Sequence, residues 1–441
     1  MTGKNPTRVN EHVLFLMSSG RKNTKSFLCC CALVLCVSAG LAQSDTSARY
    51  QARKDSTGIL DSLAVCAKRD SQKDIVDVYK WVFKRKQSAE ICEPSKKAGK
   101  LDIAFLPGFS YSGVTGIGGV ISANGAYYAD DDPNTKLSAV NTSIGYTQNN
   151  QTIITLLSNL WTKKNKYNIL GDWRYYKYPE YTYGLGGHTS IAENADKVDY
   201  SNLIIHEALL RHIPGSEFCV GMAYNMSYHW NISESGTANG QLSDFQKYGF
   251  SRTSMSSGLS VNALYDSRKN SIHPSDATYA SIYFCPNSTL LGSDHSFNTL
   301  MIDLRKYFNI GKNNVLAFWS YDWMMFNGNA PYLDLPSTGW DPYANMGRGY
   351  LQSRLRGKNL IYLESEFRFS LTPSDLVGGV VFANAQAITD WPQNKFNTLY
   401  PAAGAGLRIK VNKHSNTNIC LDYGFGINGS NGLFINLGEV F

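Results

Sequence analysis

The chain has 441 residues, 43% of them hydrophobic and 12% aromatic, and a formal net charge of +7. Four of the seven net positive charges lie in the first 42 residues, so the remainder is nearly balanced, which argues against a nucleic-acid partner. Beyond the N-terminus no uncharged apolar run reaches the ~18 residues of a membrane-spanning helix, whereas membrane β-strands need only about 9–11 residues.

The first 42 residues predict a cleavable secretory signal. Basic residues precede an apolar run from Phe27 to Val37, and small residues stand before Gln43. Met17 is an alternative start, because residues 17–42 alone form a complete signal. A short membrane anchor is the other interpretation, and the short length of the run disfavours it.

The nine cysteines do not predict a disulfide framework or a zinc site. Four of them fall in the predicted signal, and the other five are widely spaced along the chain. A Cys66–Cys92 bridge remains open in an oxidising compartment. We expect Cys219, Cys285 and Cys420 simply to pack.

Residues 43–100 form a short polar segment, predicted to be periplasmic. Residues 74–86 within it carry apolar side chains at helical spacing, with Ile75, Val78, Tyr79 and Val82 on one stripe. The interpretations are a helix against the membrane or the barrel mouth, or a partly ordered tail.

From Leu101 to Phe441 short alternating segments repeat between turn residues, which predicts an all-β chain of about sixteen antiparallel strands. The predicted strands are 101–112, 117–129, 136–147, 152–162, 167–183, 202–213, 218–231, 254–265, 277–284, 296–308, 315–326, 360–371, 377–388, 405–411, 418–425 and 433–441.

The predicted connections alternate between short and long, which is typical of a transmembrane β-barrel with short periplasmic turns and long external loops. The short turns are marked by Pro133, Pro214-Gly215, Gly311-Lys312 and Ser374-Asp375. The long loops are Ala192–Tyr200, Gly236–Gly249, Asn327–Asn359 and Thr389–Gly404. A soluble sandwich would not require this alternation.

Two strands near the end of the chain decide the interpretation. In residues 360–369 the apolar Leu363 and Phe367 alternate with the charged Glu364 and Glu366, so one face is apolar and the other is charged. The last segment, with Gly432, Ile435 and Leu437, alternates up to the aromatic Phe441. A terminal aromatic on such a strand is the pattern read by outer-membrane assembly machinery.

Several motifs resemble the BamA/TamA-type family of sixteen-stranded outer-membrane barrels, known as the bacterial surface antigen family. Gly347-Arg348-Gly349-Tyr350 resembles the tip of the family's sixth external loop, which folds back into the lumen. Residues 363–368 resemble the next strand, whose lumen Glu pairs with that Arg. The residues Asp266, Arg268, Asn270 and Pro274 resemble the family's periplasmic turn, and residues 404–408, 421–424 and 431–441 resemble its closing hairpins.

The resemblance implies a contact between Arg348 and Glu366, with Glu364 as the next candidate. The arginine fork suits a carboxylate, and the flanking glycines allow close approach of the backbone. The family's second acidic partner is replaced by Asn384, so we expect a looser Arg348 site. The chain also lacks room for the family's periplasmic repeats. Arg408, Lys410 and Asp422 lie on polar faces, either lining a pore or satisfying one another.

No catalytic motif, phosphate loop or metal-ligand spacing is present in the sequence, so we expect neither an enzyme nor a cofactor. The first functional hypothesis is a helper in outer-membrane protein assembly, insertion or translocation, acting at the seam between first and last strands. The alternatives are a passive pore or a lipid or solute transporter, and a structural, dimeric barrel. The expected partners are outer-membrane lipid including lipopolysaccharide, and client barrels or components of the assembly machinery.

Overall fold

The computed structural model describes residues 72–83, 99, 101–112, 115–132, 135–237, 240–311, 313–342, 344–413 and 416–441. All of them belong to one compact unit, Leu41–Phe441. The predicted signal and the Cys66–Cys92 pair lie outside the described residues. Cys219, Cys285 and Cys420 are free and buried, as expected.

One antiparallel sheet forms the wall of the molecule. Its strands are β1 (Asp102–Ser112), β2 (Gly116–Tyr128), β3 (Leu137–Thr147), β4 (Thr152–Trp161), β5 (Tyr167–Lys177), β6 (Glu180–Thr182), β7 (Asp196–His212), β8 (Phe218–Glu234), β9 (Ser254–Asp266), β10 (Ala277–Asn287), β11 (Phe297–Asn309), β12 (Val315–Phe326), β13 (Asn359–Ser370), β14 (Val377–Asp390), β15 (Lys395–Asn412), β16 (Thr417–Gly426) and β17 (Asn431–Leu437).

Each strand pairs with the next one along the chain, except that β5 and β6 both pair with β7. They form a single strand that is interrupted around Pro179, a residue with no N–H to donate to a ladder. The wall therefore contains sixteen strands, which confirms the predicted number and the all-β class.

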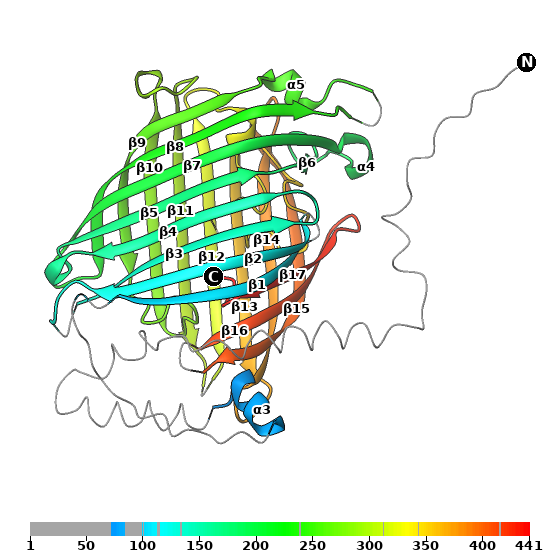
Figure 1. Ribbon diagram of the computed structural model, residues 1–441. Helices are drawn as coiled ribbons and strands as arrows, with labels where there is room; N and C mark the ends of the chain where they lie inside the picture. The colour runs from blue at the N-terminus through cyan, green and yellow to red at the C-terminus, as the bar shows by residue number, and fades with distance from the viewer. Residues whose placement is uncertain are drawn as a thin grey trace, which may run out of the picture. The chain divides into compact units, whose positions relative to one another are not determined.

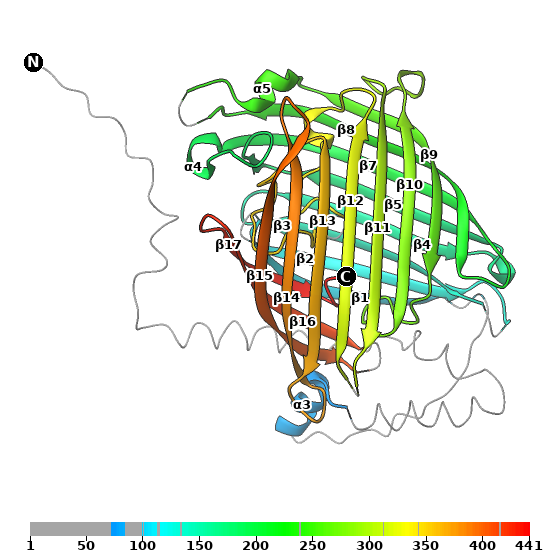
Figure 2. The ribbon, with the colours of Figure 1, turned by 180° about the vertical axis from the view of Figure 1, so that it is seen from behind.

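The sheet curls round so that β2–β5 and β7 form one wall (Figure 1) and β10–β14 form the opposite wall (Figure 2). Hydrogen-bonded ladders join all neighbours from β1 to β17. The strands β1 and β17 lie beside each other, but among the described residues no ladder joins them. We call the junction between β1 and β17 the seam.

The two faces of the wall differ in composition, as the alternation in residues 360–369 predicts. On β13, Tyr362 and Glu364 point inward and are at most 3% exposed, whereas Leu363 points outward and is 55% exposed. A sandwich would bury the apolar face. Here the apolar face is on the outside and the polar face lines the interior, which is the arrangement of a membrane barrel.

The three longest connections, residues 183–195, 235–253 and 327–358, lie at one end of the wall, which we call the loop end; the opposite end is the turn end. The loop end carries α4 (Ile191–Asn194), α5 (Asp244–Gly249), η5 (Thr289–Leu291) and η6 (Tyr332–Asp334). The turn end carries η4 (Lys163–Asn165) and α3 (Ile75–Val82). None of the described helices is long and apolar enough to cross a membrane.

One predicted long loop is wrong, and a second, Ala192–Tyr200, is displaced, because β7 already begins at Asp196. Residues 389–404 form the end of β14, a short turn at 391–394 and the first half of β15, which is 18 residues long. Turn-forming and polar residues in this stretch resemble a loop. They instead form a hairpin, in which the outward-facing Phe396 and Leu399 are 44% and 60% exposed.

The helix α3 docks on the turn that follows β15. Asp74 caps its first turn, in a reciprocal capping box with Asp77. The two carboxylates also reach Lys413: Asp77 accepts from its Nζ at 2.9 Å, and Asp74 accepts from its backbone N–H at 3.1 Å. Of the predicted helical stretch 74–86, the structure describes residues 74–83, and the helix ends at Val82.

Candidate functional site

The loop between β12 and β13, residues 327–358, folds into the interior of the barrel, and we call it the lumen loop. Its side chains Met346, Arg348, Tyr350 and Leu355 are each at most 4% exposed. Met346, Tyr350 and Leu355 join a buried cluster with the inward-facing aromatic residues of β12 and β13. The lumen loop is therefore part of the interior of the barrel.

The tip of the lumen loop requires glycine on both sides of Arg348. Gly347 and Gly349 have φ angles of +85° and +106°, which L side chains rarely adopt. A Cβ on Gly349 would lie 2.8 Å from the Cβ of Ala402 on β15, too close for real atoms. The glycines therefore allow the loop backbone to lie against the wall, so that the Arg348 side chain stays buried within the barrel.

Arg348 is fully buried and binds three carboxylates on two strands. Its Nη2 donates to Glu366 Oε2 at 2.6 Å and to Glu364 Oε1, both on β13. Its Nη1 donates to Asp422 Oδ2 on β16 at 2.5 Å. The guanidinium also lies over the Phe382 ring of β14, 3.7 Å from the centroid.

Electrostatics keeps Arg348 charged. Burial disfavours the charged guanidinium, but Glu364, Glu366 and Asp422 outweigh burial and raise the pKa of Arg348 well above its usual range. Charge-assisted hydrogen bonds of this kind are among the stronger ones in proteins. The contact therefore ties the lumen loop to the wall at any pH at which the carboxylates are ionised.

Asn384 has a different role from the one expected. Its Nδ2 donates to the carbonyl oxygen of Arg348 at 2.9 Å, so it holds the loop backbone and does not hold the guanidinium. The expected looser site is not what the structure shows, because Asp422 supplies a third carboxylate from β16. The sequence already predicts that Asp422 lies on the polar face of its strand. Its contact with Arg348 could not be predicted, because that contact depends on the curl of the sheet.

Further arginines extend the Arg348 site toward the turn end. Arg368 donates to Glu366, and its Nε lies 3.6 Å from Glu439 Oε2. Arg408 donates to Asp422 and, at 2.8 Å, to Glu439 Oε2. We call the whole set the charge network: Arg348, Arg368, Arg408, Glu364, Glu366, Asp422 and Glu439. The side chains of the set are at most 4% exposed.

Of the four predicted turn residues, Asp266 ends β9 and the other three lie between β9 and β10, close to the charge network. Arg268 donates to both carboxylate oxygens of Asp266 at 2.9 Å, and Asn270 Oδ1 accepts from two backbone N–H groups of the turn. The carbonyl oxygen of Pro274 lies 3.5 Å from Arg368 Nη1. The turn motif of residues 266–274 and the strand motif of residues 363–368, which are distant in the sequence, are therefore in contact at Arg368.

The predicted position of the last residues is wrong. The strand β17 ends at Leu437, and Gly438, with φ +90°, turns the chain inward. Phe441 is 3% exposed, its ring lies 5.2 Å from that of Trp319, and its main-chain oxygen accepts from Arg368 Nη2 at 2.9 Å. Of the four predicted signal residues, Gly432, Ile435 and Leu437 lie on β17, and Phe441 lies in the lumen.

The turn at Gly438 has a physical reason. Continued alternation would place Glu439 on the outward apolar face, where a charge is costly. Inside the barrel, burial still opposes its charge, but Arg408 and Arg368 hold the pKa of Glu439 well below its usual range. Asn345 of the lumen loop also donates to the Val440 carbonyl oxygen at 2.6 Å, so the loop and the last residues are joined directly.

A second anchor of the lumen loop lies nearer the loop end. Arg356 binds the carbonyl oxygens of Tyr332 and Leu333, and its Nη2 lies 3.6 Å from Glu180 Oε1 on β6. Glu180 also accepts from Ser353 at 2.7 Å. No motif in the sequence points to this contact, because its two sides are paired only by the fold.

We expect Asn384→Asp to destabilise the barrel by about 1–3 kcal/mol. The substitution removes the hydrogen bond to the Arg348 carbonyl oxygen and adds a fifth buried carboxylate to three arginines, directly across from Glu364 in the ladder. Urea unfolding of the detergent-folded protein measures the change, with Asn436→Asp on β17 as the control. A stabilised variant would mean that the added carboxylate is taken up by Arg348 Nε.

Among the described residues, no group of three or more His, Cys, Asp and Glu side chains is arranged to hold a metal ion. The site instead joins a loop, a wall and the last residues of the chain through ionic hydrogen bonds. Together with the outward apolar face, these features define a transmembrane β-barrel whose interior is occupied by its own sixth loop-end connection.

Solved structures have the same architecture. The chain resembles BamA from Haemophilus ducreyi lacking POTRA domains 1–3, with a TM-score of 0.51 and 13% identity over 91% of this chain and 82% of that one. It also resembles CdiB from Escherichia coli, with a TM-score of 0.50 and 9% identity over 76% of this chain and 62% of that one. Neither a protein-family model nor a curated protein matches the sequence. The chain therefore has the fold of BamA-type and CdiB-type barrels.

Proposed function

We propose that the protein is an outer-membrane barrel that assists the insertion or translocation of other polypeptides at its seam. The observation that carries this proposal is the absence of a ladder between β17 and β1 among the described residues. Unpaired strand edges expose N–H and C=O groups that can template an incoming strand. In the proposed role the turn end, which carries α3, faces the periplasm, and the loop end faces the outside of the cell.

Both sides of the seam are built weakly. The strand β17 has 7 residues, and the chain leaves the sheet at Gly438. The strand β1 contains Pro107, which has no N–H to offer a neighbour. These features support an opening at the seam that needs little disruption of the rest of the sheet.

The lumen loop supports this role over a passive pore. Arg348 and Arg356 each fix the loop inside the barrel, so a continuous water path would require two buried ion-pair contacts to break. In the proposed role the barrel acts through its edges and the surrounding lipid, lipopolysaccharide included, without catalysis or a cofactor. Planar-bilayer recordings of the intact protein should show no steady conductance, and a stable open channel would favour the pore.

Site-specific photocrosslinking tests the seam. A photoreactive residue at Leu437 on β17 should capture outer-membrane β-barrel proteins in intact cells, whereas the same residue at Leu363 on β13 should not. The two leucines are matched, because both face outward and are 66% and 55% exposed. Depletion should in addition lower the abundance of the captured proteins. Equal capture at both positions, or an unchanged outer-membrane proteome, would contradict the proposal.

A further inference from the structure

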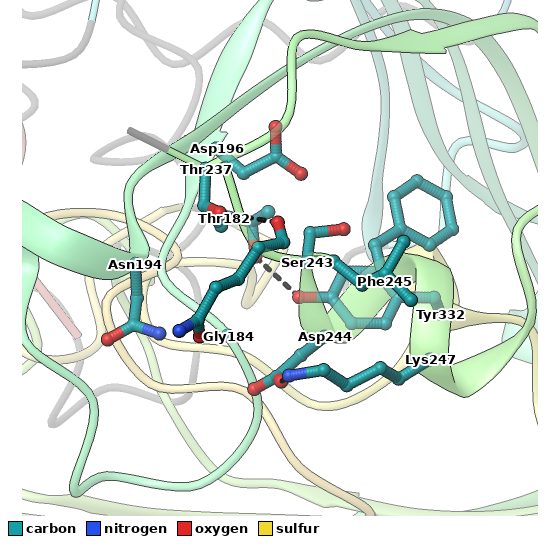
Figure 3. Close-up of a pocket in the computed structure, with 12 residues that line it drawn as sticks. Thr182, Gly184, Asn194, Asp196, Thr237, Ser243, Asp244, Phe245, Lys247 and Tyr332 are labelled. Atoms are coloured by element: carbon teal, nitrogen blue, oxygen red, sulfur yellow. Dashed lines mark hydrogen bonds and ion pairs between the residues drawn. The ribbon is translucent and has the colours of Figure 1, made fainter. Parts of the chain in front are cut away.

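A small pocket at the loop end lies where three connections meet. It is lined by Thr182 of β6, by Asn194 and Asp196 before and within β7, by Ser243 and Asp244 at α5, and by Tyr332 of the lumen loop (Figure 3). The pocket is separate from the charge network, which lies among the charged residues of β13, β15 and β16.

Asp196 is the unusual residue of this pocket. It is 1% exposed, and no donor lies within 3.5 Å and at a suitable angle for a hydrogen bond to either oxygen of its carboxylate. Figure 3 shows Asp196 at the edge of the pocket, on the side of Thr237 and Ser243. A buried carboxylate without a partner costs free energy, which a bound group would recover.

A second carboxylate stands beside Asp196. Glu234, at the end of β8, interacts directly with Asp196 and accepts a hydrogen bond from Ser243 Oγ at 2.7 Å. Neither acid forms an ion pair with a Lys or Arg among the described residues. The nearest cation lining the pocket, Lys247, pairs with Asp244 at 3.3 Å. No described Lys or Arg therefore balances the two acids, and either a shared proton or a bound cation would neutralise them.

The chemistry of the lining selects the neutralising group. The pocket that Asp196 lines also presents hydroxyl and amide side chains, from Thr182, Ser243 and Asn194, and all of these carry oxygen donors. Oxygen-only surroundings suit a hard cation, and Ca²⁺ accepts carboxylates, carbonyl oxygens and water in flexible geometry. The loop end, which the proposed orientation places outside the cell, has access to such ions.

We propose that Asp196 and Glu234 bind a calcium ion at the loop end of the barrel, with the remaining ligands coming from neutral oxygens and water. The ion joins the start of β7 to the end of β8 and, through the Thr182–Tyr332 hydrogen bond of 2.7 Å, reaches the lumen loop. Calcium would thus strengthen the attachment of the lumen loop at the loop end of the barrel, independently of any role at the seam.

Terbium luminescence tests the site directly, because Tyr332 lines the pocket and sensitises bound Tb³⁺. The full-length, detergent-folded protein is stripped with chelator, titrated with Tb³⁺ and then with Ca²⁺ or Mg²⁺. We expect one saturable, Ca²⁺-displaceable component, with Mg²⁺ displacing it more weakly. Asp196→Asn and Glu234→Gln should each weaken it at least about tenfold, since each removes a charged ligand.

Asp276→Asn is the matched control, because Asp276 is exposed at the turn end and should leave the signal unchanged. Ca²⁺ should also raise the melting temperature of the unaltered protein and not that of Asp196→Asn. An equal signal in Asp196→Asn and the control would overturn the proposal. So would an Asp196→Asn protein that is more stable than the unaltered protein in saturating Ca²⁺, because the two acids would then be sharing a proton and no ion.

Discussion

Arg348→Ala is expected to lower the free energy of unfolding of the barrel by about 3–5 kcal/mol, the usual cost of removing one partner from a buried ion pair. The substitution leaves Glu364, Glu366 and Asp422 buried with only Arg368 and Arg408 to balance them. It also frees the tip of the lumen loop from β13 and β16. Urea unfolding in detergent and the temperature at which the folded gel band disappears both measure the effect.

Lys358→Ala provides the control for this prediction. Lys358 lies at the end of the same loop, but it binds only the carbonyl oxygen of Gly328 and the side chain of Asn329, near the surface. We expect a change below about 1 kcal/mol. Arg348→Lys should fall between the two, because a lysine keeps the charge and loses the fork. If Arg348→Ala and Lys358→Ala unfold alike, the three-carboxylate contact does not hold the loop.

Asp422→Ala is expected to have a comparable effect, about 3–5 kcal/mol, because it removes a buried carboxylate that serves both Arg348 and Arg408. A double-mutant cycle with Arg348→Ala should show a coupling energy of about 0.5–3 kcal/mol, since the two residues are in direct contact. Strictly additive effects would contradict the geometry, in which Asp422 supplies the carboxylate expected at position 384.

Limited proteolysis of the lumen loop separates this effect from general destabilisation. Asp422→Ala should increase cleavage within residues 327–358, because the loop tip loses its contact with β16. Asp303→Ala is the matched control, since Asp303 also faces the lumen and pairs with Arg305 at 2.7 Å, away from the loop tip. Equal protection of the loop in both variants would mean that Asp422 stabilises only the wall.

Local patterns predicted the wall of the barrel correctly. Side-chain direction along a strand is a local property with a period of two, so the alternation around Leu363 and Glu364 was enough to assign the outward and inward faces. Turn residues between the alternating stretches predicted the strand number for the same reason. The stretch 389–404 failed because turn residues such as Pro392 and Asn394 belong to a tight hairpin turn, and the polar residues around them belong to strands.

The contacts inside the barrel could not be predicted in this way. Arg348 was assigned to Glu366 by resemblance, but the choice of Asp422 depends on which strands the curled sheet brings to the loop tip. The same is true of Arg356 and Glu180. The last residues show the limit most clearly, because the alternation runs on to Phe441 whereas the chain turns inward at Gly438.

The sequence by itself determined the β class, the number of strands, the two faces of the wall and the arginine at the loop tip, because each depends on local spacing or on a single motif. The tertiary structure alone decided that Asp422 completes the Arg348 site, that Glu439 and Phe441 enter the lumen, and that Asp196 lies buried beside Glu234 with no described Lys or Arg to pair with. Each of these features depends on contacts between segments that are distant along the chain. They depend on the curl of the sheet and on the low-dielectric interior, where charges must find partners.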